Sequence, residues 1–455
     1  MTHEAPLHSL IIGAGISGLS AGWALKKAGK SYKILEKSER PGGPIQTVRE
    51  GGFVFEKGPN TIQVDGTDLD AFFSELGLDD EIVEANPEAN KRYIVRDKTP
   101  CAVPMSTKDI FTTKLFSKKA MLSVLVEPFK KKYSSEHDES LADFVRRRLN
   151  QEFLDYAINP LIGGIYAGDP ETLSVRYGFP KIYNLEDRFG SLIKGSISIM
   201  KERKAQGTLY KTKLISFKRG MEQLPQTLAE QQTESVLFNR SISAISQGED
   251  GIWSVTVNDE GGTSTELKST QLIIACPSSA ILQLPFVENI QRPLQSISEI
   301  PHPPVTALSL GYPRKSIQHA LDGFGMLVPE KEKLSILGCL FSSTLFAGRA
   351  DSDHVGLSVF LGGTRNPELC KLSDADLLPK VKADLRALIG AEGDPVYMRR
   401  TDWPRAIPQY TIGYKKYLDL FDSIEKQNTG LKFIGHLVDG IAVPKCIRSG
   451  LHVLS

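Results

Sequence analysis

The chain has 455 residues, more than one hydrophobic core usually organises, so its length predicts two or three domains and leaves room for a large buried ligand. With 55 basic against 54 acidic residues and 40% hydrophobic content, the composition indicates an ordinary globular protein and excludes nucleic acid as an expected partner. No run of about twenty apolar residues occurs, so membrane-spanning helices are not expected.

The five cysteines are scattered, and none forms a Cys-x-x-Cys pair. An odd, dispersed set argues against a disulfide framework and against a zinc site, so we expect no metal and a reducing compartment. The apolar stretch near the N-terminus has no Lys or Arg before it, so it does not read as a secretory signal. We therefore expect a cytoplasmic protein.

The first fifty residues predict a strand–helix–strand unit typical of an α/β, Rossmann-like domain. A buried strand through Leu10 to Ile12 leads into a glycine turn, a helix from about Gly15 to Ala28, and a second strand from Tyr32 to Glu36. A chance glycine pattern in a packed helix, with a merely solvated Glu36, is the alternative.

The spacing of the glycines and of one carboxylate indicates a dinucleotide. Gly13 suits the tight turn, Gly15 lets backbone N–H groups approach a pyrophosphate, and Gly18 lets helix and strand pack closely. Glu36 follows Gly18 by eighteen positions and can accept hydrogen bonds from a ribose diol. This fits NAD and FAD alike, and Lys37 leaves NADP open.

Two further loops favour a flavin over a nicotinamide. The doublet Gly42-Gly43 in "ERPGGPIQT" supplies backbone without side chains, and "GGFVFEKGPNT" is an alternating strand that ends at Gly58-Pro59. An extended FAD molecule needs such loops beyond the first strand–helix–strand unit, although the doublet taken alone is also an ordinary turn.

Beyond residue 90 the periodicity becomes helical, and we expect a helical insert over residues 98–205. Ser140 with Asp143 three residues later predicts a helix start. The first helical segment mixes basic and apolar residues: Lys114, Lys118, Lys119, Lys130, Lys131 and Lys132 with Ile110, Phe111, Leu115, Phe116, Leu122 and Leu125. Such a mixture suits a membrane surface, or a solvated helix whose apolar face enters the core.

The later chain returns to strands. Alternation in "GIWSVTVND" and a buried strand in "QLIIACP" predict that the first sheet is completed here, so that the dinucleotide domain is discontinuous. We expect this domain over 1–88, 206–288 and 400–455, and a mixed α+β substrate domain over 89–97 and 289–399.

In order and spacing, the motifs "NPLIGGIYAGDPETLSVRYGFP", "GSLIKG", "GCLFSS", "FLGGTRN", "AIPQY" and "CIRSG" resemble the oxygen-dependent, FAD-containing protoporphyrinogen oxidases, within the amine oxidase and phytoene desaturase flavoproteins. The resemblance runs along nearly the whole chain. It implies that the closing segment "GHLVDGIAVPKCIRSG" belongs to the flavin domain and that both chain ends bind one FAD.

The resemblance also implies the cofactor contacts. Residues 13–18 would hold the pyrophosphate, and backbone at 441–443 would face the isoalloxazine. Without the resemblance, Trp403 would be interpreted as a core residue and Ile242 as a strand residue. Pro44 cannot donate a backbone hydrogen bond to the cofactor. The full set is Gly13, Ala14, Gly15, Ile16, Ser17, Gly18, Glu36, Lys37, Gly42, Gly43, Pro44, Gly58, Pro59, Asn60, Thr61, Ile242, Trp403, Ile441, Ala442 and Val443.

For the substrate, the resemblance places Arg92 at a propionate, Gly164 at the macrocycle edge, and Leu340 with Phe360 on its faces. Apolar plates and one guanidinium suit a broad ring with carboxylates on one side. The alternatives are a surface arginine and ordinary core packing. No catalytic side chain is expected, because the family's flavin N5 accepts the hydride and O₂ then reoxidises the flavin with release of H₂O₂.

Other functions stay open. Coproporphyrinogen carries two extra propionates and would need additional basic groups at the pocket mouth. Amine or carotenoid oxidation is a second enzymatic alternative, and Pro44 with the short C-terminal end supports a flavin-binding scaffold without turnover. The expected partners are a porphyrinogen, O₂ and a peripheral membrane surface on the inner face of the cell membrane, and a homodimer is compatible with the resemblance.

Overall fold

The computed structural model describes residues 5–105, 109, 112–133, 138–207 and 210–454. The first of its sheets has seven strands. In spatial order these are β10 (Val236–Leu237), β2 (Tyr32–Leu35), β1 (Leu7–Ile12), β13 (Ser264–Ile274), β12 (Trp253–Asn258) and β11 (Ser241–Gln247), with β19 (Leu431–Phe433) also on β13. Since β13 runs parallel beside β1, the later strands complete the first sheet as predicted.

The predicted strand–helix–strand unit is confirmed. β1 leads into α1 (Ile16–Lys27), and β2 lies parallel to β1 with Ile12 opposite Leu35. The last three residues of β1, Leu10–Ile12, are all apolar because helices cover both faces of the sheet. One face packs against α1, α2 (Thr67–Glu75), α11 (Gln223–Glu230) and α17 (Val443–Leu451), and the other against α13 (Glu288–Leu294) and α16 (Lys415–Gln427).

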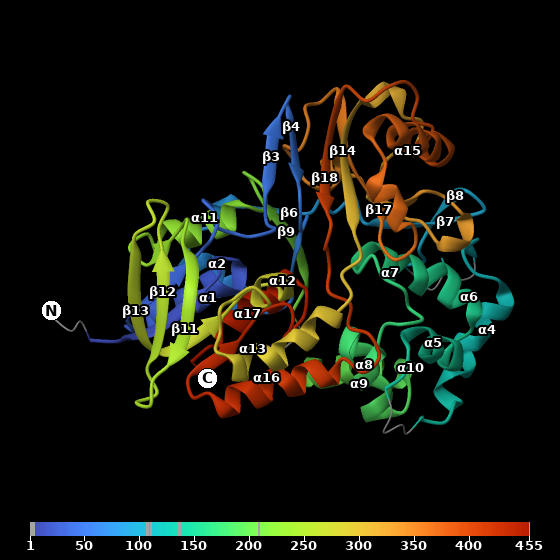
Figure 1. The fold of residues 1–455 in the computed structure, drawn as a ribbon. Helices are drawn as coiled ribbons and strands as arrows, with labels where there is room; N and C mark the ends of the chain where they lie inside the picture. The colour runs from blue at the N-terminus through green and yellow to red at the C-terminus, as the bar shows by residue number, and fades with distance from the viewer. Residues whose placement is uncertain (1–4, 106–108, 110–111, 134–137, 208–209, 455) are drawn as a thin grey trace.

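The first and the last helix of the chain lie side by side (Figure 1), because α17 packs along α1. Gly450 permits the close approach, since a Cβ at this position would lie 2.3 Å from the carbonyl oxygen of Ser17. The closing glycine-rich segment therefore belongs to the same unit as the opening glycine turn.

The second sheet also has seven strands. Their order is β18 (Tyr397–Trp403), β14 (Val305–Pro313), β17 (His354–Gly362), β16 (Ile336–Leu340), β15 (Gly323–Leu327), β7 (Lys91–Arg96) and β8 (Thr99–Ala102). α15 (Asp374–Ile389) covers one face with an apolar core. On the opposite face the hairpin of β3 (Thr47–Glu50) and β4 (Phe53–Glu56) packs at one end, where a Cβ at Gly311 would meet the Phe53 ring at 2.3 Å.

This sheet runs past both limits that the sequence predicted for the middle domain. β8 lies beyond residue 97, and β18 continues past residue 399. A tight turn joins β7 to β8, with positive φ at Asp97 (51°) and Lys98 (57°). Two-residue hairpin turns of this kind usually carry Asn-Gly or Asp-Gly, so Lys98 at the second position hid the turn signal.

A third, three-stranded sheet lies between these units, in the order β5 (Ile62–Val64), β9 (Lys213–Phe217) and β6 (Ile82–Glu84). The insert that follows β8 is helical. Its helices are α4 (Lys118–Val126), α5 (Leu141–Arg148), α6 (Gln151–Phe153), α7 (Asn159–Ile165), α8 (Val175–Gly178), α9 (Pro180–Phe189) and α10 (Leu192–Ala205). The predicted start of α5 is confirmed, since the Ser140 hydroxyl accepts a hydrogen bond from the Asp143 N–H at 3.0 Å.

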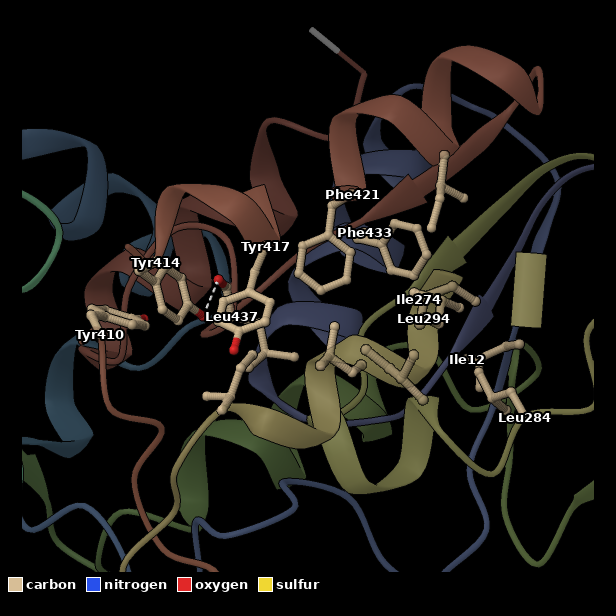
Figure 2. Packing of buried hydrophobic residues seen from close by; sticks show 14 of the residues in the cluster. Ile12, Ile274, Leu284, Leu294, Tyr410, Tyr414, Tyr417, Phe421, Phe433 and Leu437 are labelled. Atoms are coloured by element: carbon tan, nitrogen blue, oxygen red, sulfur yellow. Dashed lines mark hydrogen bonds between the residues drawn. The ribbon is translucent and has the colours of Figure 1, made fainter. Parts of the chain in front are cut away.

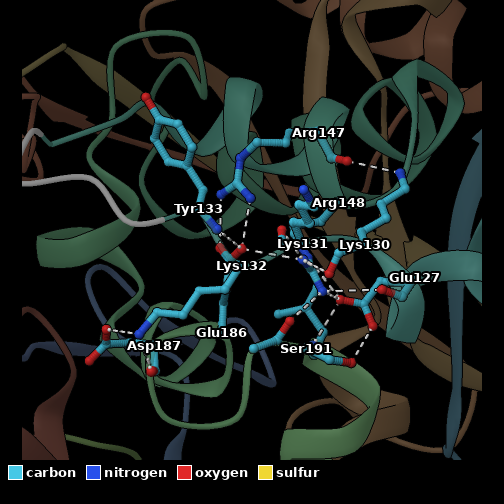
Figure 3. A network of polar contacts seen from close by, with 12 residues as sticks. Glu127, Lys130, Lys131, Lys132, Tyr133, Arg147, Arg148, Glu186, Asp187 and Ser191 are labelled. Carbon is cyan, nitrogen blue, oxygen red and sulfur yellow. Dashed lines mark hydrogen bonds and ion pairs between the residues drawn. The ribbon is translucent and has the colours of Figure 1, made fainter.

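A buried ion-pair network joins the helices of the insert (Figure 3). Arg148 and Glu127 are fully buried and paired, and Glu186 binds both Arg148 and Arg147. Burial alone would raise the pKa of Glu127, but hydrogen bonds from Ser191, the Leu192 N–H and Arg148 bring it below the usual value. The network therefore holds α5, α9 and α10 against the segment after α4.

The lysine-rich helical segment is only partly as expected. Ile110 and Phe111 lie outside the described residues, Leu115 is buried beside Ile94 and Tyr156, and Leu122 and Leu125 are 57% and 70% exposed. Lys130 does not face solvent, because its ammonium group donates to the carbonyls of Arg147 (2.8 Å) and Leu149 (3.2 Å). Part of this segment therefore packs into the core, and part of its apolar surface is exposed.

Within the described ranges, no helix has the length and apolar character that crossing a bilayer requires. The same residues contain no group of three or more His, Cys, Asp or Glu side chains placed to hold a metal ion.

Candidate active site

The opening glycine turn leaves the start of a helix open. Gly13 has φ of 105°, which favours glycine, and α1 begins after Gly15 without a side-chain cap. A Cβ at Gly15 would meet nothing within 4 Å, so the space before the helix is open. The free N–H groups of the first turn and the helix dipole favour a phosphate there.

The Glu36 carboxylate is fixed beside this turn. It accepts hydrogen bonds from the Ala14 N–H (2.8 Å), the Ser38 N–H (2.9 Å) and the Ser38 hydroxyl (2.8 Å). Lys37 is exposed. The Arg240 N–H donates to the Glu36 carbonyl at 2.9 Å, which brings the start of β11, and with it Ile242, to the same edge of the sheet.

The two additional glycine loops pack against the first one. The Gly42 N–H donates to the Ala14 carbonyl at 2.8 Å, and a Cβ at Gly58 would come within 2.1 Å of the Pro44 carbonyl oxygen. The Asn60 side chain donates to the Gly58 carbonyl at 3.1 Å and follows Pro59 in the same loop as Thr61. Residues 13–18, 42–44 and 58–61 are therefore brought together.

The closing loop completes this group. A Cβ at Gly435 would lie 3.0 Å from the Ser17 hydroxyl, so the loop contacts the first turn of α1. Ala442 precedes α17 and is exposed, whereas Ile441 is half-buried and Val443 is buried. The structure thus places all four predicted loops at one edge of the first sheet.

Three titratable side chains near these loops, Cys276, Cys446 and His436, are uncharged at neutral pH. Burial raises the pKa of the Cys276 thiol to about 12, with Glu36 adding to the shift, and raises that of Cys446 to about 11. Burial lowers the pKa of His436 to about 4, with His302 contributing. An open helix start, glycine-bearing loops and these uncharged groups fit a dinucleotide that carries its own reactive ring.

The four predicted substrate residues lie on one side of the second sheet. Arg92 pairs with Gly325, Gly325 with Leu340, and Leu340 with Ser358, two positions before Phe360. Gly164 of α7 approaches this face, where a Cβ would come within 2.5 Å of the Leu327 side chain. Their neighbours along the strands, including Tyr93, Cys339 and Val359, point to the opposite face, into the core beneath α15.

The loops and this face meet at two points. The Trp403 indole N–H donates to the Lys57 carbonyl at 3.0 Å, which joins the end of β18 to the 57–61 loop. Leu340 and Asn60 line one small cavity, together with Val54, Phe55, Glu56, Ser342, Leu345, Phe346 and Arg349. One predicted cofactor residue, Asn60, and one predicted substrate residue, Leu340, therefore lie at the same cavity.

Sequence reasoning missed the buried acid in this cavity. Burial raises the pKa of Glu56 to about 7, although Arg349, the Thr47 hydroxyl and the Met221 N–H act against the shift. The Thr47 hydroxyl donates to Glu56 at 2.6 Å, and the Met221 N–H donates at 3.0 Å. The only signal was a charged residue closing the apolar strand "FVF".

The sequence model of one protein family decides the class of this site. The family described as flavin containing amine oxidoreductase matches residues 16–453. The chain belongs to this family. It is an FAD-dependent oxidoreductase, which confirms the class and the cofactor expected from the motifs.

Named relatives of this flavin oxidoreductase match along its whole length. It is 32% identical to the mitochondrial protoporphyrinogen oxidase of Nicotiana tabacum, over 98% of this chain and 94% of that one. It is 26% identical to the coproporphyrinogen III oxidase of Bacillus subtilis (strain 168), over 98% and 97%. A crystal structure from Exiguobacterium sp. 255-15 shares the fold, with a TM-score of 0.80, 24% identity and coverage of 99% and 98%.

Proposed function

We propose that this flavin oxidoreductase converts protoporphyrinogen IX to protoporphyrin IX in porphyrin biosynthesis. The observation that carries the proposal is the 32% identity to a protoporphyrinogen oxidase across 98% of the chain. The conversion removes six electrons and six hydrogens, so three two-electron steps consume three O₂ and release three H₂O₂. FAD supplies the two-electron acceptor chemistry when bound, with O₂ as the final acceptor.

The chain's own task is to hold FAD and exclude water. We propose that the first turn of α1 binds the pyrophosphate, that Glu36 lies beside the adenine-side ribose, and that residues 42–44, 58–61 and 441–443 follow the cofactor toward the ring. The assembly of these loops at one sheet edge supports this arrangement. Ile242 and Trp403 lie beside the same loops and complete the proposed set.

The second sheet would orient the substrate. Arg92 is exposed, its guanidinium lies 5.5 Å from the Phe324 ring centre, and it has no carboxylate partner in the described part of the chain. An unpaired guanidinium can bind a propionate, while Leu340 and Phe360 offer apolar surface to the ring. Gly164 lies against Leu327 on the same face, and we propose that this part of α7 borders the macrocycle edge.

Coproporphyrinogen III is the second candidate substrate, favoured by the Bacillus subtilis relative. The two substrates differ where vinyl groups replace propionates. Turnover of both porphyrinogens in parallel, followed by porphyrin fluorescence, tests the proposal. Higher kcat/KM for protoporphyrinogen supports it, higher kcat/KM for coproporphyrinogen assigns the alternative, and turnover of neither contradicts both. Peroxide formation with an amine or a carotene instead would assign the chain to another branch of the family.

We further propose that the insert rests on an anionic membrane surface on the cytoplasmic side of the cell membrane. An apolar stripe is exposed on α4, the turn after it and α10, comprising Leu122, Leu125, Val126, Phe129, Ile197 and Met200. The Lys194 ammonium lies 5.8 Å from the Phe129 ring centre, which joins the two helices, and Lys118, Lys119, Lys201 and Lys204 are exposed on the same helices. Apolar and basic groups together match a lipid interface. A homodimer remains a prediction.

A further inference from the structure

Two tyrosine hydroxyls hold the backbone of the closing glycine loop. The Tyr410 hydroxyl donates to the carbonyl of His436, and the Tyr414 hydroxyl donates to the carbonyl of Leu437 at 2.8 Å. Figure 2 shows the second of these contacts within the aromatic cluster. Both tyrosines are nearly inaccessible, at 5% and 2% exposure, so water does not compete for these hydrogen bonds.

The tyrosines are themselves rigidly placed. Their ring centres lie 4.6 Å apart, and Tyr410 also contacts Tyr166 of the insert at 6.1 Å. The Ser174 N–H donates to the Tyr410 carbonyl at 2.8 Å, and the Ile412 N–H donates to the Thr172 carbonyl at 2.9 Å. The segment around residue 410 is therefore pinned to the insert and cannot follow a shift of the closing loop.

The held carbonyls determine where the loop's N–H groups point. The described chain contains no cis peptide bond, so the Leu437 N–H points away from the carbonyl of His436 and from Tyr410. Leu437 is 2% exposed, yet its N–H has no acceptor among the described residues. Buried backbone donors are almost always satisfied, so this N–H is free to bind an acceptor from outside the chain.

The place of this donor identifies the ligand. Its loop begins at Gly435, which contacts Ser17 in the first turn of α1, and ends at the start of α17. Backbone hydrogen bonds from the Val438 and Asp439 N–H groups to the Gly435 carbonyl, at 3.0 and 2.9 Å, keep the loop tight. An acceptor at this position would be an oxygen of the FAD that the surrounding loops are proposed to hold.

We propose that Tyr410 and Tyr414 are positioning residues for FAD: they fix the peptide groups at 436–438 so that the Leu437 N–H is presented to an oxygen atom of the cofactor. The proposal rests on the proposed placement of FAD along the four loops. It assigns to the "AIPQY" segment a role in cofactor affinity rather than in substrate contact.

The test compares FAD affinity in three conservative variants. Tyr410→Phe and Tyr414→Phe keep the rings and remove the hydroxyls. Tyr417→Phe is the matched control, because its ring lies 5.4 Å from Tyr414 in the same cluster, whereas its hydroxyl faces Glu299 at 3.4 Å and not the loop. Apoprotein of each is titrated with FAD by flavin fluorescence, and the melting temperature of each apoprotein is recorded.

We expect the FAD dissociation constant to rise roughly 5- to 10-fold in Tyr410→Phe and in Tyr414→Phe, and to change less than about 2-fold in Tyr417→Phe. If FAD affinity were unchanged in both test variants, with or without a lower apoprotein melting temperature, the proposal would be overturned. The two tyrosines would then only pack in the core. Failure of the wild-type apoprotein to bind FAD would contradict the cofactor placement itself, a result distinct from the first.

Discussion

Gly450 and Ser17 join the two ends of the chain, because a Cβ at Gly450 would lie 2.3 Å from the Ser17 carbonyl oxygen and 2.7 Å from the Ala21 nitrogen. The atoms that it would meet are backbone, which cannot rotate away. We therefore expect Gly450→Ala to lower the free energy of unfolding by about 1–3 kcal/mol, as overpacking does, and to weaken FAD retention. Chemical denaturation measures the first effect. Gly178→Ala is the control, since a Cβ there meets nothing within 4 Å, and an equal loss in both variants would refute the role of the contact.

A substitution at Gly15 should prevent cofactor binding without disturbing the fold. Its φ of −69° suits any residue, and a Cβ there meets nothing within 4 Å, so Gly15→Val should fold normally. The same side chain would occupy the space proposed for the pyrophosphate, so the variant should purify without FAD and fail to take it up. Absorbance of the visible flavin bands, before and after FAD is added, measures how much FAD the variant retains and how much it takes up. Wild-type FAD content in Gly15→Val would show that the cofactor does not approach this turn.

Arg92 should affect substrate recognition without affecting the flavin. A charge-assisted hydrogen bond contributes about 1.5–3 kcal/mol, so Arg92→Ala should lower kcat/KM for protoporphyrinogen by roughly ten- to more than a hundredfold, mainly through KM. Arg92→Lys should recover part of the loss, because it keeps the charge but lacks the planar fork.

Lys91→Ala provides the control for this experiment, since Lys91 pairs with Asp322 and its side chain points to the other face of the sheet. Steady-state kinetics with matched FAD occupancy compare the three variants. If Arg92→Ala retained the kcat/KM of the wild type, the residue would not contact the substrate.

The apolar stripe on the insert should determine membrane binding. Leu125 and Phe129 are 70% and 84% exposed, so changing both to Ser should leave the fold intact and remove the two most exposed apolar side chains of the stripe. We expect at least about a tenfold loss of binding to anionic vesicles, on the scale of the free energy of burying such side chains. Co-sedimentation at rising salt measures this, and wild-type binding should fall as salt increases. The matched control is Val396→Ser, because Val396 is 58% exposed and lies outside the stripe. If the double variant bound vesicles as strongly as the wild type, the stripe would not be the surface that contacts lipid.

The features that could be predicted from the sequence are those that depend on the local backbone. The glycine turn, α1 and the carboxylate at Glu36 follow from spacing within one strand–helix–strand unit, and β13 was recognisable as a buried strand beside β1. Contacts between distant segments were not predictable in this way. The pairing of Glu56 with Arg349, 293 positions later (349 − 56), leaves no periodic trace in the sequence.

The directions in which side chains point could not be predicted from the sequence either. Lys130 was grouped with the lysines of a membrane surface, but two carbonyl acceptors at the end of α5 turn it inward. The hydroxyls of Tyr410 and Tyr414 are indistinguishable from those of core tyrosines until the closing loop is seen against them.

Anaerobic mixing with protoporphyrinogen IX is the decisive test of the proposed oxidation, because it observes the transfer of electrons from substrate to the protein's flavin without O₂. We expect the visible flavin absorbance to bleach on mixing and to return on admission of air, with protoporphyrin fluorescence and peroxide appearing together. If the flavin of FAD-loaded protein stayed oxidised with protoporphyrinogen IX, under conditions where dithionite reduces it, the protein would not oxidise this substrate.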